Sequence, residues 1–181
     1  KVAVAKDGFT FHVCQLRPES RGRVGLRSAD PMDHPAIFAN YLATEEDRRA
    51  IREGVKMMRE VARQSALDPY RGPEYSPGEA VQTDEEIDAW IKRTSETIYH
   101  PVGTCKMGAD GDAMAVVDAE LKVRGLTGLR VIDASVMPTL VGGNTNAPTI
   151  MIAEKASDMI LGRPALPAED APVYEDGQQA A

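Results

Sequence analysis

The chain has 181 residues and a formal net charge of −7 at pH 7. Hydrophobic residues make up 43% and charged residues 27%, the balance of an ordinary globular protein with room for one large domain or parts of two. This composition excludes a basic nucleic-acid surface, and no apolar run reaches the roughly 20 residues of a transmembrane segment. Two distant cysteines without ligand spacing predict reduced thiols in the cytoplasm.

The first part of the chain predicts β structure. KVAVA at 1–5 is typical of a strand, and apolar and polar residues alternate over 9–17. A Pro- and Gly-containing turn leads to a second strand at 23–27, so that 9–28 is predicted to form an antiparallel hairpin. Two prolines in 29–43 indicate a surface loop.

Three helices are predicted. Thr44 is suited to cap a helix over 45–65, in which apolar residues follow helical spacing. A capping box that starts at Thr83 predicts a second helix ending near Ser95. A third is expected over 148–161, with proline in its first turn and Gly162 at its end.

Two shorter segments precede the third helix, and a tail follows it. Residues 121–123 and 128–133 read as short strands separated by glycines. Residues 163–181 are rich in Ala, Pro and acids, a composition typical of a disordered tail.

His100 is the first candidate for chemistry. It stands between Tyr99 and Pro101, which forces extended backbone. Imidazole suits proton abstraction from an alcohol because its ordinary pKa lies nearest neutrality. Without further information, a hydrogen-bonded structural histidine in a loop is the competing interpretation.

Other polar positions suggest a bound anionic or planar ligand. Asp133 ends an apolar segment and is followed by small residues, so it either approaches a ligand or caps a turn. The third helix presents its positive amino terminus to an anionic partner, and Gly142-Gly143 allows a planar ring to approach closely. His12 is expected to lie on a strand and His34 at the surface, without a functional role for either. The spacing of the histidines does not predict a metal site.

The motifs together resemble one known family. HPVGTCKMG at 100–108 and NTNAPTIMIAEK at 144–155 are similar to the carboxyl-terminal part of the glucose–methanol–choline (GMC) oxidoreductases, in particular the choline-dehydrogenase-like alcohol dehydrogenases. HVCQLRPESRGRV at 12–24 resembles their substrate-domain sheet. The resemblance implies an α+β/α/β fold: a carboxyl-terminal fragment of a two-domain flavoprotein, in which an antiparallel substrate-domain sheet with helices returns to a Rossmann-like FAD-binding domain.

The resemblance also implies domains and roles. Residues 1–98 would belong to the substrate-binding domain and 99–162 to the FAD-binding domain. His100 would take the hydroxyl proton of a primary alcohol as hydride passes to N5 of FAD, and Asn144 would hydrogen-bond the same oxygen. The FAD contacts implied are Tyr99, Asp133, Ala134, Asn146, Pro148 and Thr149.

One departure from the family is large, because the chain carries no GxGxxG dinucleotide-binding turn. The sequence therefore predicts a fragment whose partners are an amino-terminal FAD-binding part, an alcohol, and a quinone, oxygen or other electron acceptor, through which it could associate with a membrane. A hydroxynitrile lyase of the same fold and a truncated interaction module are the alternatives.

Overall fold

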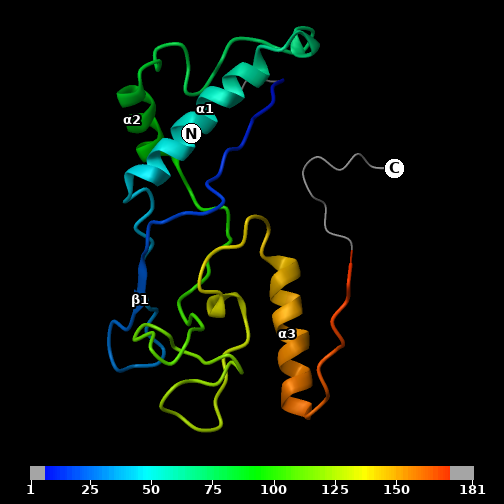
Figure 1. Cartoon of the computed structure of the whole chain (residues 1–181). Helices are drawn as coiled ribbons and strands as arrows, with labels where there is room; N and C mark the ends of the chain where they lie inside the picture. The colour runs from blue at the N-terminus through cyan, green and yellow to red at the C-terminus, as the bar shows by residue number, and fades with distance from the viewer. Residues whose placement is uncertain (1–6, 172–181) are drawn as a thin grey trace.

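The computed structural model describes residues 7–171 and has an α+β architecture, which confirms the predicted fold class. In Figure 1 the first two helices lie at one end of the molecule and the third helix at the other, with loops between them. The elements in chain order are β1 (Arg23–Gly25), β2 (Ala36–Phe38), α1 (Glu45–Ala62), a 3₁₀ turn (Ser65–Leu67), α2 (Asp84–Thr94), a second 3₁₀ turn (Ala134–Val136) and α3 (Asn146–Leu161). The strand expected at 1–5 lies outside the described residues.

Helix α1 confirms the predicted helix and ends three residues earlier than expected. The Thr44 hydroxyl accepts a hydrogen bond from the Asp47 N–H at 3.2 Å and so caps its amino terminus. At the other end the N–H of Arg63 bonds the carbonyls of Arg59 and Glu60, which closes the last turn.

Helix α2 has the predicted capping box and packs on α1. The Thr83 hydroxyl accepts from the Glu86 N–H, and the Glu86 carboxylate accepts from the Thr83 N–H. The backbone N–H groups of Thr83 and Gln82 both donate to the Glu86 carboxylate and lower the pKa of Glu86. Ile87 and Ile91 are fully buried between the two helices. Arg52 of α1 reaches across to α2, where it donates to Asp88 at 2.5 Å.

The predicted hairpin over 9–28 is wrong. Residues 9–17 form no strand. The turn that follows them binds to α1: the N–H groups of Glu19 and Ser20 donate to the buried carboxylate of Asp47 at 2.9 and 2.8 Å. Because this contact ties the turn to α1, the preceding segment runs beside that helix instead of folding back on β1. Val13 lies against Gly54, where a Cβ would come within 2.3 Å of a Val13 methyl group.

The segment 29–43 contains a strand, contrary to the loop that was predicted for it. β1 pairs antiparallel with β2, and Val24 lies opposite Ile37. Asn40 fixes the end of this ribbon through a hydrogen bond from its side chain to the Arg21 carbonyl at 2.9 Å. Pro31 and Pro35 precede the paired residues, so they do not interrupt the ladder.

The largest core of the described residues lies in the second half of the chain. Val117, Leu121, Val136, Met137, Ile152 and Ala156 form one buried cluster. The strands predicted at 121–123 and 128–133 are reduced to isolated bridges, Val117–Val123 and Lys122–Arg130. Leu121 adopts a left-handed φ of 62°, which interrupts extended backbone and explains why no continuous strand forms.

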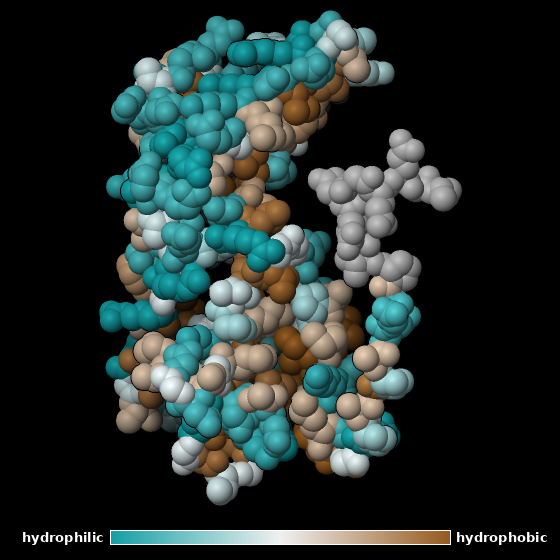
Figure 2. Space-filling model, in the orientation of Figure 1, coloured by the Kyte–Doolittle hydropathy of each residue, from teal (hydrophilic) through white to brown (hydrophobic). Residues whose placement is uncertain are grey.

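Helix α3 confirms the third predicted helix, beginning two residues earlier. Gly162 ends it in the left-handed conformation, with φ of 66°. One side of α3 enters the core, yet Ile150, Met151 and Leu161 are more than half exposed on its other sides. Figure 2 shows hydrophobic residues at the surface over α3 and along the middle of this face. Residues 163–171 contain no helix or strand, and the remainder of the predicted disordered tail lies outside the described residues.

Candidate active site

The backbone conformation around His100 is fixed by two residues with positive φ, Tyr99 and Gly103. Tyr99 adopts a φ of 64° and its N–H donates to the Thr97 hydroxyl at 3.0 Å, which turns the chain just before the histidine. Gly103, at φ of 87°, passes so close to the Met137 carbonyl that a Cβ would lie 3.3 Å from its oxygen. The side chain of His100 is half-buried while Tyr99 is exposed.

The imidazole of His100 contacts the residue next to Asn144. Nδ1 of His100 lies 2.9 Å from Oγ1 of Thr145, within hydrogen-bonding distance, and Thr145 is 8% exposed. The contact joins residues 45 positions apart in sequence. It brings the two predicted catalytic residues, His100 and Asn144, to the same part of the surface, where Asn144 is exposed.

The amino terminus of α3 is open. Thr145 occupies the N-cap position but makes no capping hydrogen bond, because its hydroxyl faces His100 and Pro148 has no N–H to offer. Within 7–171 the N–H groups of Asn146 and Ala147 have no acceptor. The helix therefore presents two unpaired donors and a partial positive charge beside Asn144.

Thr149 uses its polar groups within the helix. Both its N–H and its hydroxyl donate to the Thr145 carbonyl, at 3.1 and 2.6 Å. Pro148 is half-buried and Asn146 is exposed. Of the predicted FAD contacts in this helix, Asn146 therefore has a side chain free to reach a ligand, and Thr149 does not while these bonds are kept.

Asp133 acts as the cap of the short 3₁₀ turn. Its Oδ1 accepts from the Ser135 N–H at 2.7 Å, which is one of the two interpretations open from the sequence. The turn is joined to the His100 segment because the N–H groups of Cys105 and Met107 donate to the carbonyls of Ser135 and Val136. Ala134 in the same turn packs against the core.

Three segments that carry the predicted site residues, 99–107, 133–137 and 144–149, are thus held together by hydrogen bonds and by one core. The residues around α3 fit an anionic, planar group: unpaired N–H donors at the helix end, an exposed carboxamide and a glycine turn that leaves space beside it. Among the described residues no cluster of His, Cys, Asp and Glu has the arrangement of a metal site, and both His12 and His34 are exposed.

Two residues near this site went unnoticed in the sequence. Thr145 could have been found from Pro148, because a proline three residues after a threonine N-cap leaves the hydroxyl without its usual partner. Arg17 gave no such signal. Its guanidinium packs on Gly142, where a Cβ would lie 3.0 Å from Nη2, and it links the amino-terminal segment to the turn that carries Asn144.

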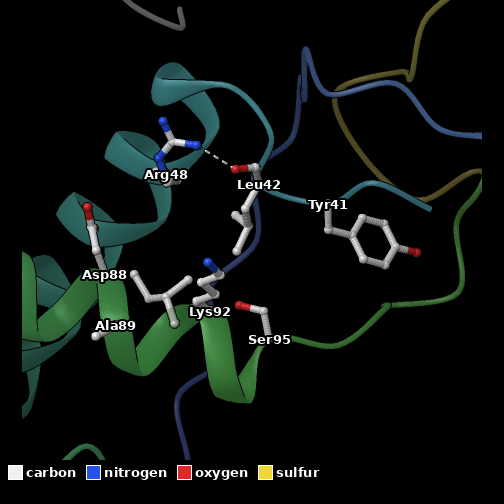
Figure 3. Close-up of a pocket in the computed structure, with 8 residues that line it drawn as sticks. Tyr41, Leu42, Arg48, Asp88, Ala89, Lys92 and Ser95 are labelled. Atoms are coloured by element: carbon white, nitrogen blue, oxygen red, sulfur yellow. Dashed lines mark hydrogen bonds between the residues drawn. The ribbon is translucent and has the colours of Figure 1, made fainter. Parts of the chain in front are cut away.

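A separate cavity of about 480 Å³ lies between the helices at the other end of the molecule. Figure 3 shows Arg48 of α1 reaching the Leu42 carbonyl at its edge, a hydrogen bond of 2.7 Å. The other polar side chains that line it are those of Tyr41, Asp88, Lys92 and Ser95. The cavity shares no residue with the candidate site, and none of its residues was predicted to carry chemistry.

Comparison with known proteins agrees with the motifs and the fold. A family model described as GMC oxidoreductase matches residues 18–153, and the chain belongs to this family. The sequence is 53% identical over 172 residues to an oxygen-dependent choline dehydrogenase from Acinetobacter baumannii (strain AYE), a match that covers 95% of this chain and 31% of that relative. The family predicted from the two motifs is therefore confirmed.

Solved structures show the same fold. Pyridoxine 4-oxidase from Mesorbium loti superposes with a TM-score of 0.76 at 35% identity, over 83% of this chain and 29% of that one. A fungal aryl-alcohol oxidase gives a TM-score of 0.72 at 32% identity, over 81% of this chain and 24% of the other. No helix within 7–171 is long and apolar enough to cross a membrane.

Proposed function

We propose that the chain is the carboxyl-terminal part of an FAD-dependent alcohol dehydrogenase and that it supplies the catalytic His100 and Asn144. The observation that carries this proposal is the 2.9 Å contact between His100 and Thr145, which holds the imidazole next to Asn144 and to the open end of α3. The identity to choline dehydrogenases supports choline or a similar primary alcohol as substrate, with a quinone or oxygen as acceptor.

FAD, when bound, would supply the oxidising chemistry as the acceptor of the hydride from the alcohol carbon. His100 takes the hydroxyl proton at Nε2, the ring nitrogen that Thr145 leaves free. Asn144, whose carboxamide has donors as well as an acceptor, binds the alcohol oxygen and orients it toward the imidazole.

Cofactor contacts are proposed at the same place. The unpaired N–H groups of Asn146 and Ala147 and the positive end of α3 favour negative charge, which suits the pyrimidine side of FAD. The other proposed contacts to FAD are made by Tyr99, Asp133, Ala134, Pro148 and Thr149. They are made chiefly through main-chain atoms, because Asp133 and Thr149 already use their side chains within the protein.

A further part of the protein completes the site in this proposal. The chain covers 31% of the length of a curated relative and contains no dinucleotide-binding GxGxxG turn. Exposed Ile150, Met151 and Leu161 on α3 are suited to pack against that part, because large apolar side chains that gather on a protein surface commonly mark a contact with another surface. Residues 1–98 and 99–162 would then belong to the substrate and FAD domains; the core cluster, which lies entirely within 99–162, supports that division.

Rapid mixing of the complete FAD-containing protein, including the part that precedes this chain, with choline under anaerobic conditions tests the proposal. His100→Ala is expected to slow bleaching of the flavin absorbance by about 10²–10⁴-fold, the usual contribution of a general base, while FAD remains bound. Asn144→Ala should slow it less. His12→Ala is the matched control, since His12 is exposed and lies outside the site.

Near-normal bleaching in His100→Ala would remove the histidine from its role as base. Cyanide release from a cyanohydrin without any bleaching by alcohol would replace the dehydrogenase with a lyase. Each result can be separated from a folding defect by the amount of FAD that elutes with the protein.

A further inference from the structure

Thr145 makes the only hydrogen bond to the His100 side chain among the described residues, and the proposed function uses this contact only to place the imidazole beside Asn144. We propose that Thr145 is a positioning residue: its hydroxyl accepts a hydrogen bond from Nδ1–H of His100 and so keeps Nε2 unprotonated, ready to take the proton of the alcohol. This inference rests on the proposed function, because it assigns the ring nitrogen that acts as base.

The Thr145 hydroxyl is available for this contact because it has no capping duty. An N-cap threonine ordinarily accepts from an N–H two or three residues later. Here the third residue is Pro148, which has no N–H, and the next one, Thr149, donates to the Thr145 carbonyl instead. The hydroxyl is buried, so water does not compete strongly for it.

The direction of the hydrogen bond follows from what a base must do. A histidine that accepts a proton becomes imidazolium, in which both ring nitrogens carry hydrogen. An acceptor facing Nδ1 is therefore satisfied both before and after the transfer. A hydroxyl that donated to Nδ1 would instead place the single proton of the neutral ring on Nε2, where it would block the reaction.

The proton balance is simple. The alcohol O–H bond breaks, an N–H bond forms at Nε2, and the electron pair left on oxygen becomes part of the new carbonyl as the carbon loses its hydride, for which FAD would be the two-electron acceptor. Throughout, Nδ1–H stays bonded to Thr145. The backbone on both sides of the imidazole limits rotation of this segment, because Tyr99 adopts a left-handed φ and Pro101 has a fixed φ.

The tautomer can be measured directly by ¹⁵N NMR of the FAD-containing protein labelled at histidine, with His100 assigned from the signals lost in His100→Gln. Neutral His100 is expected to carry its hydrogen on Nδ1. Thr145→Val keeps the side-chain shape without the acceptor and should move the hydrogen to Nε2 in a large fraction of molecules. Thr145→Ser should restore the Nδ1–H form.

Ser157→Ala is the matched control, since it removes another hydroxyl of α3, one that donates to the Ala153 carbonyl and does not touch His100. It should leave the tautomer unchanged. A wild-type His100 with hydrogen on Nε2, or a Thr145→Val protein with an unchanged tautomer, would overturn the proposal.

Kinetics give a second readout. Thr145→Val should lower the rate of flavin bleaching by choline about tenfold to a hundredfold, less than removal of the base, with little change in KM. Thr145→Ser, which keeps the acceptor, and Ser157→Ala, which lies outside the site, should stay within about threefold of the wild type. A rate in Thr145→Val within that range would contradict the positioning role.

These results remain separable from failure of the proposed function. If His100→Ala bleaches normally, His100 is not the base, whatever its tautomer. If His100→Ala is slow but Thr145→Val is normal in tautomer and rate, the base stands and only the role of Thr145 falls.

Discussion

The two ends of the molecule are held together in different ways. At one end, α1 and α2 have their own caps and are joined by buried Ile87 and Ile91 and by ion pairs across the helices. At the other end, the candidate site consists of short turns and loops, connected by hydrogen bonds between residues far apart in sequence. The first arrangement can be understood from neighbouring residues, whereas the second depends on the whole second half of the chain.

This difference has a functional consequence. The helix pair can lose stability without any change in the geometry around His100, because no helix of the pair contributes a residue to the site. The core beneath the site has no such independence. Val136 is buried in it, and the backbone of the same residue holds Met107 in the His100 segment.

Truncation of one isoleucine at each end is the strongest test of this separation. Ile87→Ala and Ile152→Ala each remove a buried side chain and should lower the free energy of unfolding by about 2–5 kcal/mol. Ile152 lies in the first half of α3 and joins that helix to the core, so its loss should also weaken FAD retention and slow flavin bleaching. Ile87→Ala should leave both unchanged in the folded fraction.

Denaturant unfolding and flavin absorbance of the same samples measure the two effects. Equal losses of bleaching rate in both variants, after correction for the folded fraction, would show that the two ends are coupled. Leu26→Ala is a suitable control because this apolar side chain is exposed and should cost little.

The second prediction concerns the link between the amino-terminal segment and α1. Asp47→Ala leaves the N–H groups of Glu19 and Ser20 without their acceptor, a loss of about 2–4 kcal/mol in the free energy of unfolding. Burial raises the pKa of Asp47, but hydrogen bonds from Ser20 and Glu19 outweigh burial, so that the pKa is lowered below its ordinary value. The ionised form is therefore the stabilising one.

Ionisation of Asp47 makes the free energy of unfolding depend on pH. The contribution of Asp47 is complete above the ordinary carboxyl pKa of about 4 and is lost as pH falls through the lower folded-state pKa. The stability difference between wild type and Asp47→Ala should thus be large at pH 7 and shrink on acidification below pH about 4. Urea unfolding at several pH values measures it, and a difference that is independent of pH would contradict an ionised role for Asp47.

The parts of this structure that local chemistry determines could be predicted from the sequence. Thr44, Thr83 and Gly162 mark helix ends because caps act within four residues. The hairpin over 9–28 failed for the opposite reason. Asp47 looked like one of several acids in a first helical turn, and only the fold shows that it takes up the N–H groups of a turn almost thirty residues away.

The same contrast applies to the candidate site. His100 and Asn144 were found because their motifs resemble a family, and their roles are still predictions. Thr145 was missed since its importance depends on a contact with a residue 45 positions away. For Asp133 the sequence left two interpretations open, and the hydrogen bond from Ser135 establishes that it caps a turn without excluding a ligand nearby.

The smallest predicted effect compares two threonines at helix amino termini. Thr83→Ala removes a true capping hydrogen bond and should lower the free energy of unfolding by about 1 kcal/mol. Thr145→Val removes no capping bond but removes the hydrogen bond to His100, so it should cost a similar amount, about 0.5–1.5 kcal/mol. The functional effects should differ: Thr83→Ala should bleach flavin at the normal rate, and Thr145→Val should not. Thermal unfolding and rapid mixing on the two variants measure both quantities, and equal bleaching rates in the two variants would contradict the distinction between a capping and a positioning threonine.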